Sequence, residues 1–128
     1  MHEYSVVTEL VDALLPRLER HEGDIAAVYL KKGSLRILSD RALKNAFEVV
    51  AQGTRLEGAS LEIEEIPARI ACKTCAYEGP AEVYEDESLH FAVPVLSCPK
   101  CEGEVEIRAG RELLVDRVSI RSMLDEGA

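Results

Sequence analysis

Four cysteines arranged as two Cys-x-x-Cys pairs are the feature that most constrains this chain. Cys72 and Cys75 form the first pair, Cys98 and Cys101 form the second, and 22 residues separate the pairs. Each pair can form a tight turn that directs two sulfur atoms to one point, and two such turns complete a tetrahedron of thiolates. The pattern predicts a closed structural Zn²⁺ site. Because common zinc ribbons have a gap of about 15–20 residues, the longer gap also predicts an extra loop.

Other uses of the four thiols stay open from the spacing alone. The turn Cys98-Pro99-Lys100-Cys101 accepts iron, as in rubredoxin, as readily as it accepts zinc. Ala76 and Glu102 follow the two pairs where glycine would strengthen the comparison with rubredoxin. A dithiol redox pair and disulfides are further alternatives, although a reducing compartment disfavours disulfides.

The stretch around the cysteines has little apolar sequence, whereas the regions flanking it have regular apolar periodicity. Apolar residues recur at helical spacing from Val6 to Leu18 and again over residues 39–53, which predicts two amphipathic helices. They alternate with other residues over 26–31, 59–66 and 112–120, which predicts three strands. We therefore expect an α+β fold: a small mixed domain with two helices and a three-stranded sheet, with an inserted zinc-ribbon-like module. The expected boundaries are 1–69 plus 112–128 for the first domain and 70–111 for the insertion.

Proline, glycine and capping residues predict where the helices begin and end. Pro16 lies inside the first predicted helix and removes a backbone donor, so we expect a kink or a locally loosened last turn before the helix ends near Gly23. Ser39 or Asp40 is expected to cap the second helix, and Gly53 to end it. Between the helices, residues 35–38 form a second, weaker extended stretch.

Charge and composition exclude several classes of function. With 15 Lys and Arg against 24 Asp and Glu, the net charge of −9 has the wrong sign for binding nucleic acid. No apolar run approaches the roughly 18 residues of a membrane span, and no signal peptide is evident, so a cytoplasmic protein without membrane contact is expected. The only histidines are His2, His21 and His90, and no catalytic constellation or phosphate-binding glycine loop accompanies them. We expect no enzymatic activity.

The first three residues offer a second set of metal donors. With Met1 as a free N-terminus, its amine, the following backbone amides and the His2 imidazole can supply nitrogen donors in one plane. That geometry suits Ni²⁺ or Cu²⁺. A lone histidine at position 2 is also commonly an uninvolved exposed side chain, so the pattern alone leaves both interpretations open.

Several short motifs occur in a fixed order along nearly the whole chain. They are Met-His-Glu-Tyr-Ser at residues 1–5, Phe47 leading to Gly53-Thr54, the run Glu57–Ile63, the two cysteine pairs with Cys98-Pro99, and the closing run Gly110–Val115. Together they resemble the HypA/HybF family, the nickel-insertion accessory proteins of [NiFe]-hydrogenase maturation. This chain departs from the family pattern at Leu30–Leu35, where an Ile-Gly run is usual.

The resemblance implies a role for each motif. Met1, His2 and Glu3 would bind Ni²⁺ as a transient cargo, and Cys72, Cys75, Cys98 and Cys101 would hold structural zinc. The protein would be a nickel metallochaperone that delivers the ion to the hydrogenase large subunit with a nickel-handling GTPase of the HypB type. His90 is a candidate extra nickel ligand, or an ordinary exposed loop histidine. The alternative function is that of a zinc-ribbon protein-interaction module with no nickel role.

Overall fold

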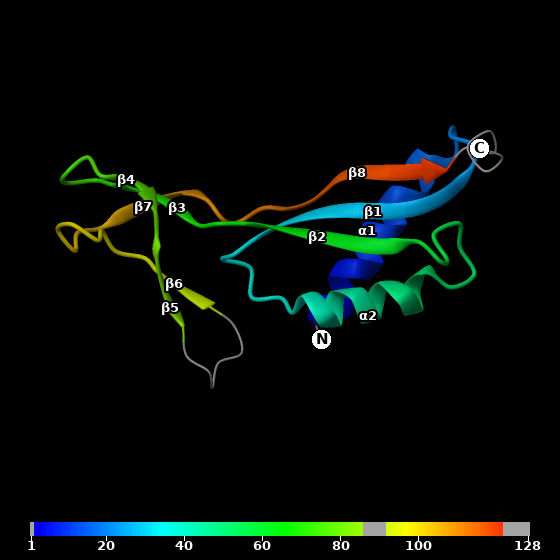
Figure 1. The fold of residues 1–128 in the computed structure, drawn as a ribbon, viewed down its shortest axis with the longest axis horizontal. Helices are drawn as coiled ribbons and strands as arrows, with labels where there is room; N and C mark the ends of the chain where they lie inside the picture. The colour runs from blue at the N-terminus through cyan, green and yellow to red at the C-terminus, as the bar shows by residue number, and fades with distance from the viewer. Residues whose placement is uncertain (1, 86–91, 122–128) are drawn as a thin grey trace. The chain divides into compact units, whose positions relative to one another are not determined.

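The computed structural model describes residues 2–85 and 92–121 (Figure 1). Contacts divide these residues into two compact units. The first comprises the described residues up to Leu30, Leu38–Glu64 and the described residues from Leu114 onwards. The second comprises Lys31–Ile37 and the described residues of Glu65–Leu113.

The first unit contains two helices and a three-stranded sheet, as the sequence predicts. The helices are α1, His2–Leu18, and α2, Asp40–Ala51. The sheet has the order β2-β1-β8, formed by β1, Asp24–Gly33, β2, Ser60–Ile66, and β8, Leu113–Arg121. Strand β8 thus returns to the first sheet, and α1 lies behind it in the view of Figure 1, packed against α2. The α+β expectation is confirmed.

The apolar face of each helix forms the core of this unit. Val7, Val11 and Leu18 of α1 are buried, and so are Leu43 and Phe47 of α2. The Ser39 hydroxyl accepts a hydrogen bond from the Ala42 N–H at 3.2 Å, which identifies Ser39 as the N-cap of α2. None of the helices in the described ranges combines the length and the apolar character that crossing a membrane requires.

Two local expectations are wrong in detail. Helix α1 ends at Leu18, before Gly23, because the chain turns there and the His21 N–H bonds to the Leu18 carbonyl at 3.0 Å. The stretch 35–38 is not a strand. Strand β1 runs to Gly33, and the Arg36 N–H then bonds back to the Gly33 carbonyl at 2.9 Å, which closes a turn.

Arg55 holds the end of α1 in place. Its guanidinium donates to the carbonyls of Leu18 and His21, and to that of Gly23 at 3.0 Å. The last carbonyls of a helix have no intrahelical partner, and a cation is favoured at that end. Arg55 therefore supplies the C-terminal cap that the sequence of α1 lacks.

Replacing Arg55 should destabilise the first unit. We expect Arg55→Ala to lower the free energy of unfolding by about 1–3 kcal/mol, because charged hydrogen bonds to three carbonyls are lost. Chemical denaturation followed by circular dichroism measures this change. Arg41→Ala, at an exposed position of α2, is the matched control and should change the free energy by less than about 0.5 kcal/mol. Equal stability of the two variants would contradict the capping role.

The second unit is built from short strands around a small core. Its sheet has the order β4-β3-β7, with β3 at Arg69–Cys72, β4 at Glu78–Pro80 and β7 at Val105–Ala109. An antiparallel hairpin of β5, Glu82–Glu85, and β6, Ala92–Val95, accounts for the extra length between the cysteine pairs. Among the described residues of this unit, the buried members of the core cluster are Ala68, Ile70 and Ala81, with Leu35, Tyr77 and Val105 packed against them.

The segment Lys31–Ile37 belongs to this second unit, although the expected boundaries placed it in the first domain. The reason is backbone pairing with a turn far along the chain. The Gly33 N–H donates to the Glu112 carbonyl at 2.7 Å, and the Leu35 N–H to the Gly110 carbonyl at 2.8 Å. The unit also begins at Glu65 and reaches Leu113, so it is larger than the expected insertion of residues 70–111.

Candidate metal centre

The four cysteine sulfurs of the second unit meet at one point. Their Sγ atoms all lie within 4.8 Å of one another, with 3.6 Å between Cys72 and Cys101 and 3.5 Å between Cys75 and Cys98. None of the four forms a disulfide in the structure. Cys72 and Cys98 are buried, whereas Cys75 and Cys101 are exposed. Each pair therefore contributes one inner and one outer thiol.

The two pairs occupy turns of the same construction. In the first, the Cys72 N–H donates to the Tyr77 carbonyl at 2.7 Å, and in the second the Cys98 N–H donates to the Gly103 carbonyl at 3.1 Å. The backbone N–H two residues after each inner cysteine points at its sulfur, from Thr74 to Cys72 at 3.3 Å and from Lys100 to Cys98 at 3.4 Å. Both turns thus place N–H donors against a sulfur, as thiolate ligands of a metal require.

The residue after each pair has a left-handed backbone. Ala76 has a φ of 66° and Glu102 a φ of 61°. Residues other than glycine rarely adopt this left-handed backbone conformation. The sequence lacks glycine at both positions, yet the turns take the conformation that glycine would favour. Strain of this kind persists only where surrounding interactions determine it, and here the two converging cysteine turns do so.

Backbone donors and neighbouring thiols shift the cysteine pKa values in opposite directions. The N–H groups of Cys75 and Thr74 lower the pKa of Cys72 to about 6. The N–H of Gly103 lowers the pKa of Cys101, but the thiols of Cys72 and Cys75 raise it more, to about 12. Neighbouring thiolates repel one another, so four adjacent thiols do not all lose their protons unless a cation lies among them.

The donor set fits a tetrahedral metal ion. A Zn–S bond of about 2.3 Å in a tetrahedron requires sulfurs about 3.8 Å apart. The Sγ–Sγ distances of 3.6 Å for Cys72 and Cys101 and 3.5 Å for Cys75 and Cys98, in a cluster no wider than 4.8 Å, are close to this value. Four thiolates fill the coordination shell of zinc and leave no position for substrate. The arrangement supports a structural role.

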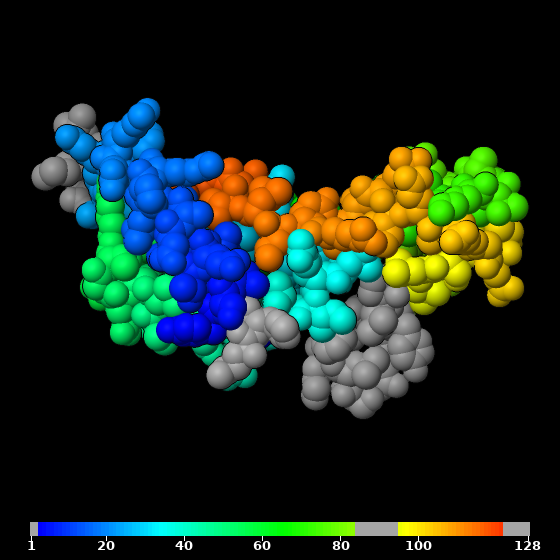
Figure 2. All heavy atoms as spheres, turned by 180° about the vertical axis from the view of Figure 1, so that it is seen from behind, coloured from blue at the N-terminus to red at the C-terminus, as the bar shows by residue number. Residues whose placement is uncertain are grey.

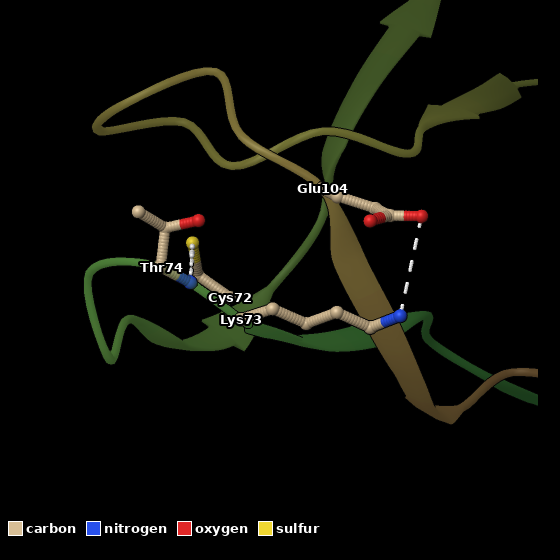
Figure 3. Close-up of polar contacts among 4 residues, drawn as sticks. All are labelled: Cys72, Lys73, Thr74 and Glu104. Carbon is tan, nitrogen blue, oxygen red and sulfur yellow. Dashed lines mark hydrogen bonds and ion pairs between the residues drawn. The ribbon is translucent and has the colours of Figure 1, made fainter.

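The charged side chain of Lys73, the residue after Cys72, points away from the Cys72 sulfur (Figure 3). Figure 3 shows Lys73 extended toward Glu104, while the Cys72 sulfur lies beside the Thr74 N–H. The Lys73 Nζ to Glu104 Oε1 distance is 4.0 Å, and these side chains are 55% and 81% exposed. Such an exposed pair contributes little, so the sulfurs and the backbone N–H groups define the centre.

The other predicted metal ligands are only partly within the described residues. Met1 and His90 lie outside them, and His2 is the first residue of α1. Glu3 is described: its Oε2 accepts a hydrogen bond from the Ser39 N–H at 3.0 Å. The Glu3 carboxylate therefore ties the start of α1 to the N-cap of α2, a role that sequence reasoning missed because 36 residues separate the partners.

Comparison with known proteins gives the same family throughout. The family model described as "Hydrogenase/urease nickel incorporation, metallochaperone, hypA" matches residues 1–120. The hydrogenase maturation factor HypA of Methanothermobacter thermautotrophicus is 37% identical over 122 residues, covering 94% of this chain and 97% of that protein. The HypA of Ignicoccus hospitalis is 36% identical over 131 residues, covering 91% of this chain and 94% of that one.

Solved structures show the same fold. The solution structure of the Ni metallochaperone HypA from Helicobacter pylori has a TM-score of 0.60 at 21% identity, covering 92% of this chain and 96% of that one. A second solution structure of a HypA protein has a TM-score of 0.64 at 22% identity, covering 94% and 97%. With a family match over residues 1–120 and relatives that align over almost their full length, the chain belongs to the HypA family of hydrogenase and urease nickel-incorporation metallochaperones.

Proposed function

We propose that this protein binds Ni²⁺ at its N-terminus and delivers it to the large subunit of a [NiFe]-hydrogenase. The observation that carries the proposal is the family match from residue 1 onwards, together with Met-His-Glu as the first three residues. The role is the binding and transfer of an ion, so the protein itself would catalyse no reaction. By family resemblance the partners are a GTPase of the HypB type and the hydrogenase large subunit.

The start of α1 is chemically suited to nickel. Helix α1 begins at His2, so the backbone amides of His2 and Glu3 lie at the helix N-terminus, next to the Met1 amine in sequence, where a bound metal would take the place of their protons. With the Met1 amine and the His2 imidazole they make a set of nitrogen donors that suits planar Ni²⁺. Because the Glu3 carboxylate is bonded to the Ser39 N–H, we assign Glu3 to the site through its backbone amide. His90 stays a proposed additional ligand.

A site at a chain end also suits delivery. A donor site should let an acceptor add ligands before it releases the ion, and a chain end leaves one side of the metal open. We assign Zn²⁺ at the four cysteines to holding the second unit together, and we place the protein in the cytoplasm, where reducing conditions keep the thiols available as ligands.

Complementation tests delivery directly. In a bacterium that has a [NiFe]-hydrogenase but lacks its own HypA protein, this chain should restore hydrogenase activity and radioactive nickel in the large subunit. The His2→Ala variant should restore neither at low nickel. Restoration of both by His2→Ala would overturn the nickel role and favour the alternative, a zinc-containing protein-interaction module.

A further inference from the structure

A hollow in the second unit is lined by two arginines and three apolar side chains. It is lined by Leu35, Arg36, Leu96, Ile107 and Arg111 and has a volume of about 420 Å³. We propose that this arginine hollow is a docking site for a short, extended, acidic segment of a partner protein. An apolar side chain of that segment would rest on the leucines and Ile107, and its carboxylates would bond to Arg36 and Arg111. The proposal does not depend on nickel binding.

The backbone around the arginine hollow is fixed before any partner arrives. Besides the two bonds that join Gly33 and Leu35 to the turn at Gly110, the Arg36 Nε donates to the Arg111 carbonyl at 2.9 Å. A Cβ on Gly33 would lie 2.0 Å from the Gly110 carbonyl oxygen, so only glycine permits this approach. The Glu112 carboxylate accepts the Gly110 N–H at 2.7 Å and holds the turn from the other side. A preorganised site loses little entropy on binding.

The charge of the hollow is opposite to that of the chain. Within residues 2–85 and 92–121, neither Arg36 nor Arg111 forms an ion pair, whereas the neighbouring Arg108 lies 3.5 Å from Glu106. The whole chain has 24 acidic residues against 15 basic ones, so carboxylates are abundant and yet none faces these two guanidiniums in the described structure. Guanidinium forks bind carboxylates in pairs of parallel hydrogen bonds.

The apolar lining residues favour a peptide over a simple anion or a nucleic acid. Leu96 is 48% exposed, and Ile37, beside the lining residues in sequence, is 76% exposed. Apolar surface next to arginine is typical of the centre of protein interfaces. A phosphate or a nucleic-acid backbone has no apolar group that would pack against Leu35, Leu96 and Ile107. The hollow therefore favours a segment with glutamate or aspartate beside a large apolar residue.

The test uses the full zinc-loaded chain and a short synthetic peptide in which leucine and phenylalanine alternate with glutamate. Titration followed by ¹H–¹⁵N NMR should shift the amides of Leu35, Arg36, Leu96, Ile107 and Arg111, with a dissociation constant on the order of 10–100 µM. Arg36→Gln and Arg111→Gln should each weaken binding about tenfold. Arg108→Gln, on β7 but outside the hollow, is the matched control and should leave binding unchanged. A peptide with glutamine in place of glutamate should bind much less tightly.

Three outcomes would overturn the proposal. The first is the absence of saturable shifts with the acidic peptide, and the second is equal affinity of the wild type and both hollow variants. The third is a dimer in sedimentation velocity that Arg111→Gln dissolves, because a second copy of the chain would then be the occupant. The NMR spectra of the two variants check their folding, so loss of binding with an intact spectrum supports the docking site.

Discussion

Removal of the metal is expected to unfold the second unit and to leave the first unit folded. The reason is the small core of the second unit: in the part of the chain that the structure describes, the buried cluster has one large side chain, Ile70. Structural zinc contributes about 10–16 kcal/mol in small domains of this kind, far more than this core can supply. The first unit has its own core around Val7, Leu30 and Leu43, each fully buried, and needs no metal.

The effect can be measured in the full chain by chelation and by Cys98→Ser. Cys98 is the more deeply buried of the two inner ligands, at 1% exposed. We expect zinc affinity to fall at least a hundredfold, on the order of what disturbing a metal shell produces. The NMR signals of β3, β4 and β7 should lose their dispersion, while those of α1 and α2 stay in place. Elemental analysis of the untreated protein distinguishes zinc from iron.

Lys73→Ala is the matched control for this prediction. Lys73 directly follows a ligand, but its side chain points toward Glu104 in an exposed pair that contributes at most about 1 kcal/mol (Figure 3). The variant should retain one equivalent of zinc and an unchanged spectrum. Retention of β3, β4 and β7 after complete chelation would mean that the second unit folds on its own core and that the metal has another role.

Periodicity and local motifs predicted the elements that depend on neighbouring residues. The apolar face of α2 and its cap at Ser39 are contained within a few residues, and the sequence specifies both. The geometry of each cysteine pair is also local, because a Cys-x-x-Cys turn directs its two sulfur atoms to one point without help from distant residues. Bringing the two turns together needs only the pairing of β3 with β7.

Features that depend on distant partners could not be read from the sequence. Arg55 reaches carbonyls at the end of α1, and 37 residues separate it from Leu18. Arg36 bonds to the Arg111 carbonyl across 75 residues, and nothing in the composition of Lys31–Ile37 indicates that this segment joins the second unit. In Figure 2, which views the molecule from behind, the atoms of this segment are cyan and lie on the surface. Exposed polar residues have no periodic signal, so only the folded chain reveals their contacts.

His2→Ala is expected to abolish nickel binding while leaving zinc content and fold unchanged. Backbone amides give up their protons to Ni²⁺ only when stronger ligands hold the ion beside them, and the His2 imidazole and the Met1 amine are those anchors in the proposed site. Loss of one anchor should therefore remove the amide ligands as well. We expect affinity to fall by about a hundredfold or more, measured by titration of the untagged protein with Ni²⁺ and by its visible absorption.

The matched control is His21→Ala, which removes an exposed histidine from the turn after α1. Its side chain has no part in the proposed site, so the variant should bind one nickel ion as the wild type does. An extra residue before Met1 should act like His2→Ala, because it displaces the amine from the donor set. Binding should weaken as the pH falls, since protons compete for the amine, the imidazole and the amides. Nickel binding by His2→Ala at wild-type affinity would exclude the N-terminal site and direct attention to other ligands, while an unchanged zinc content would show that the fold is intact.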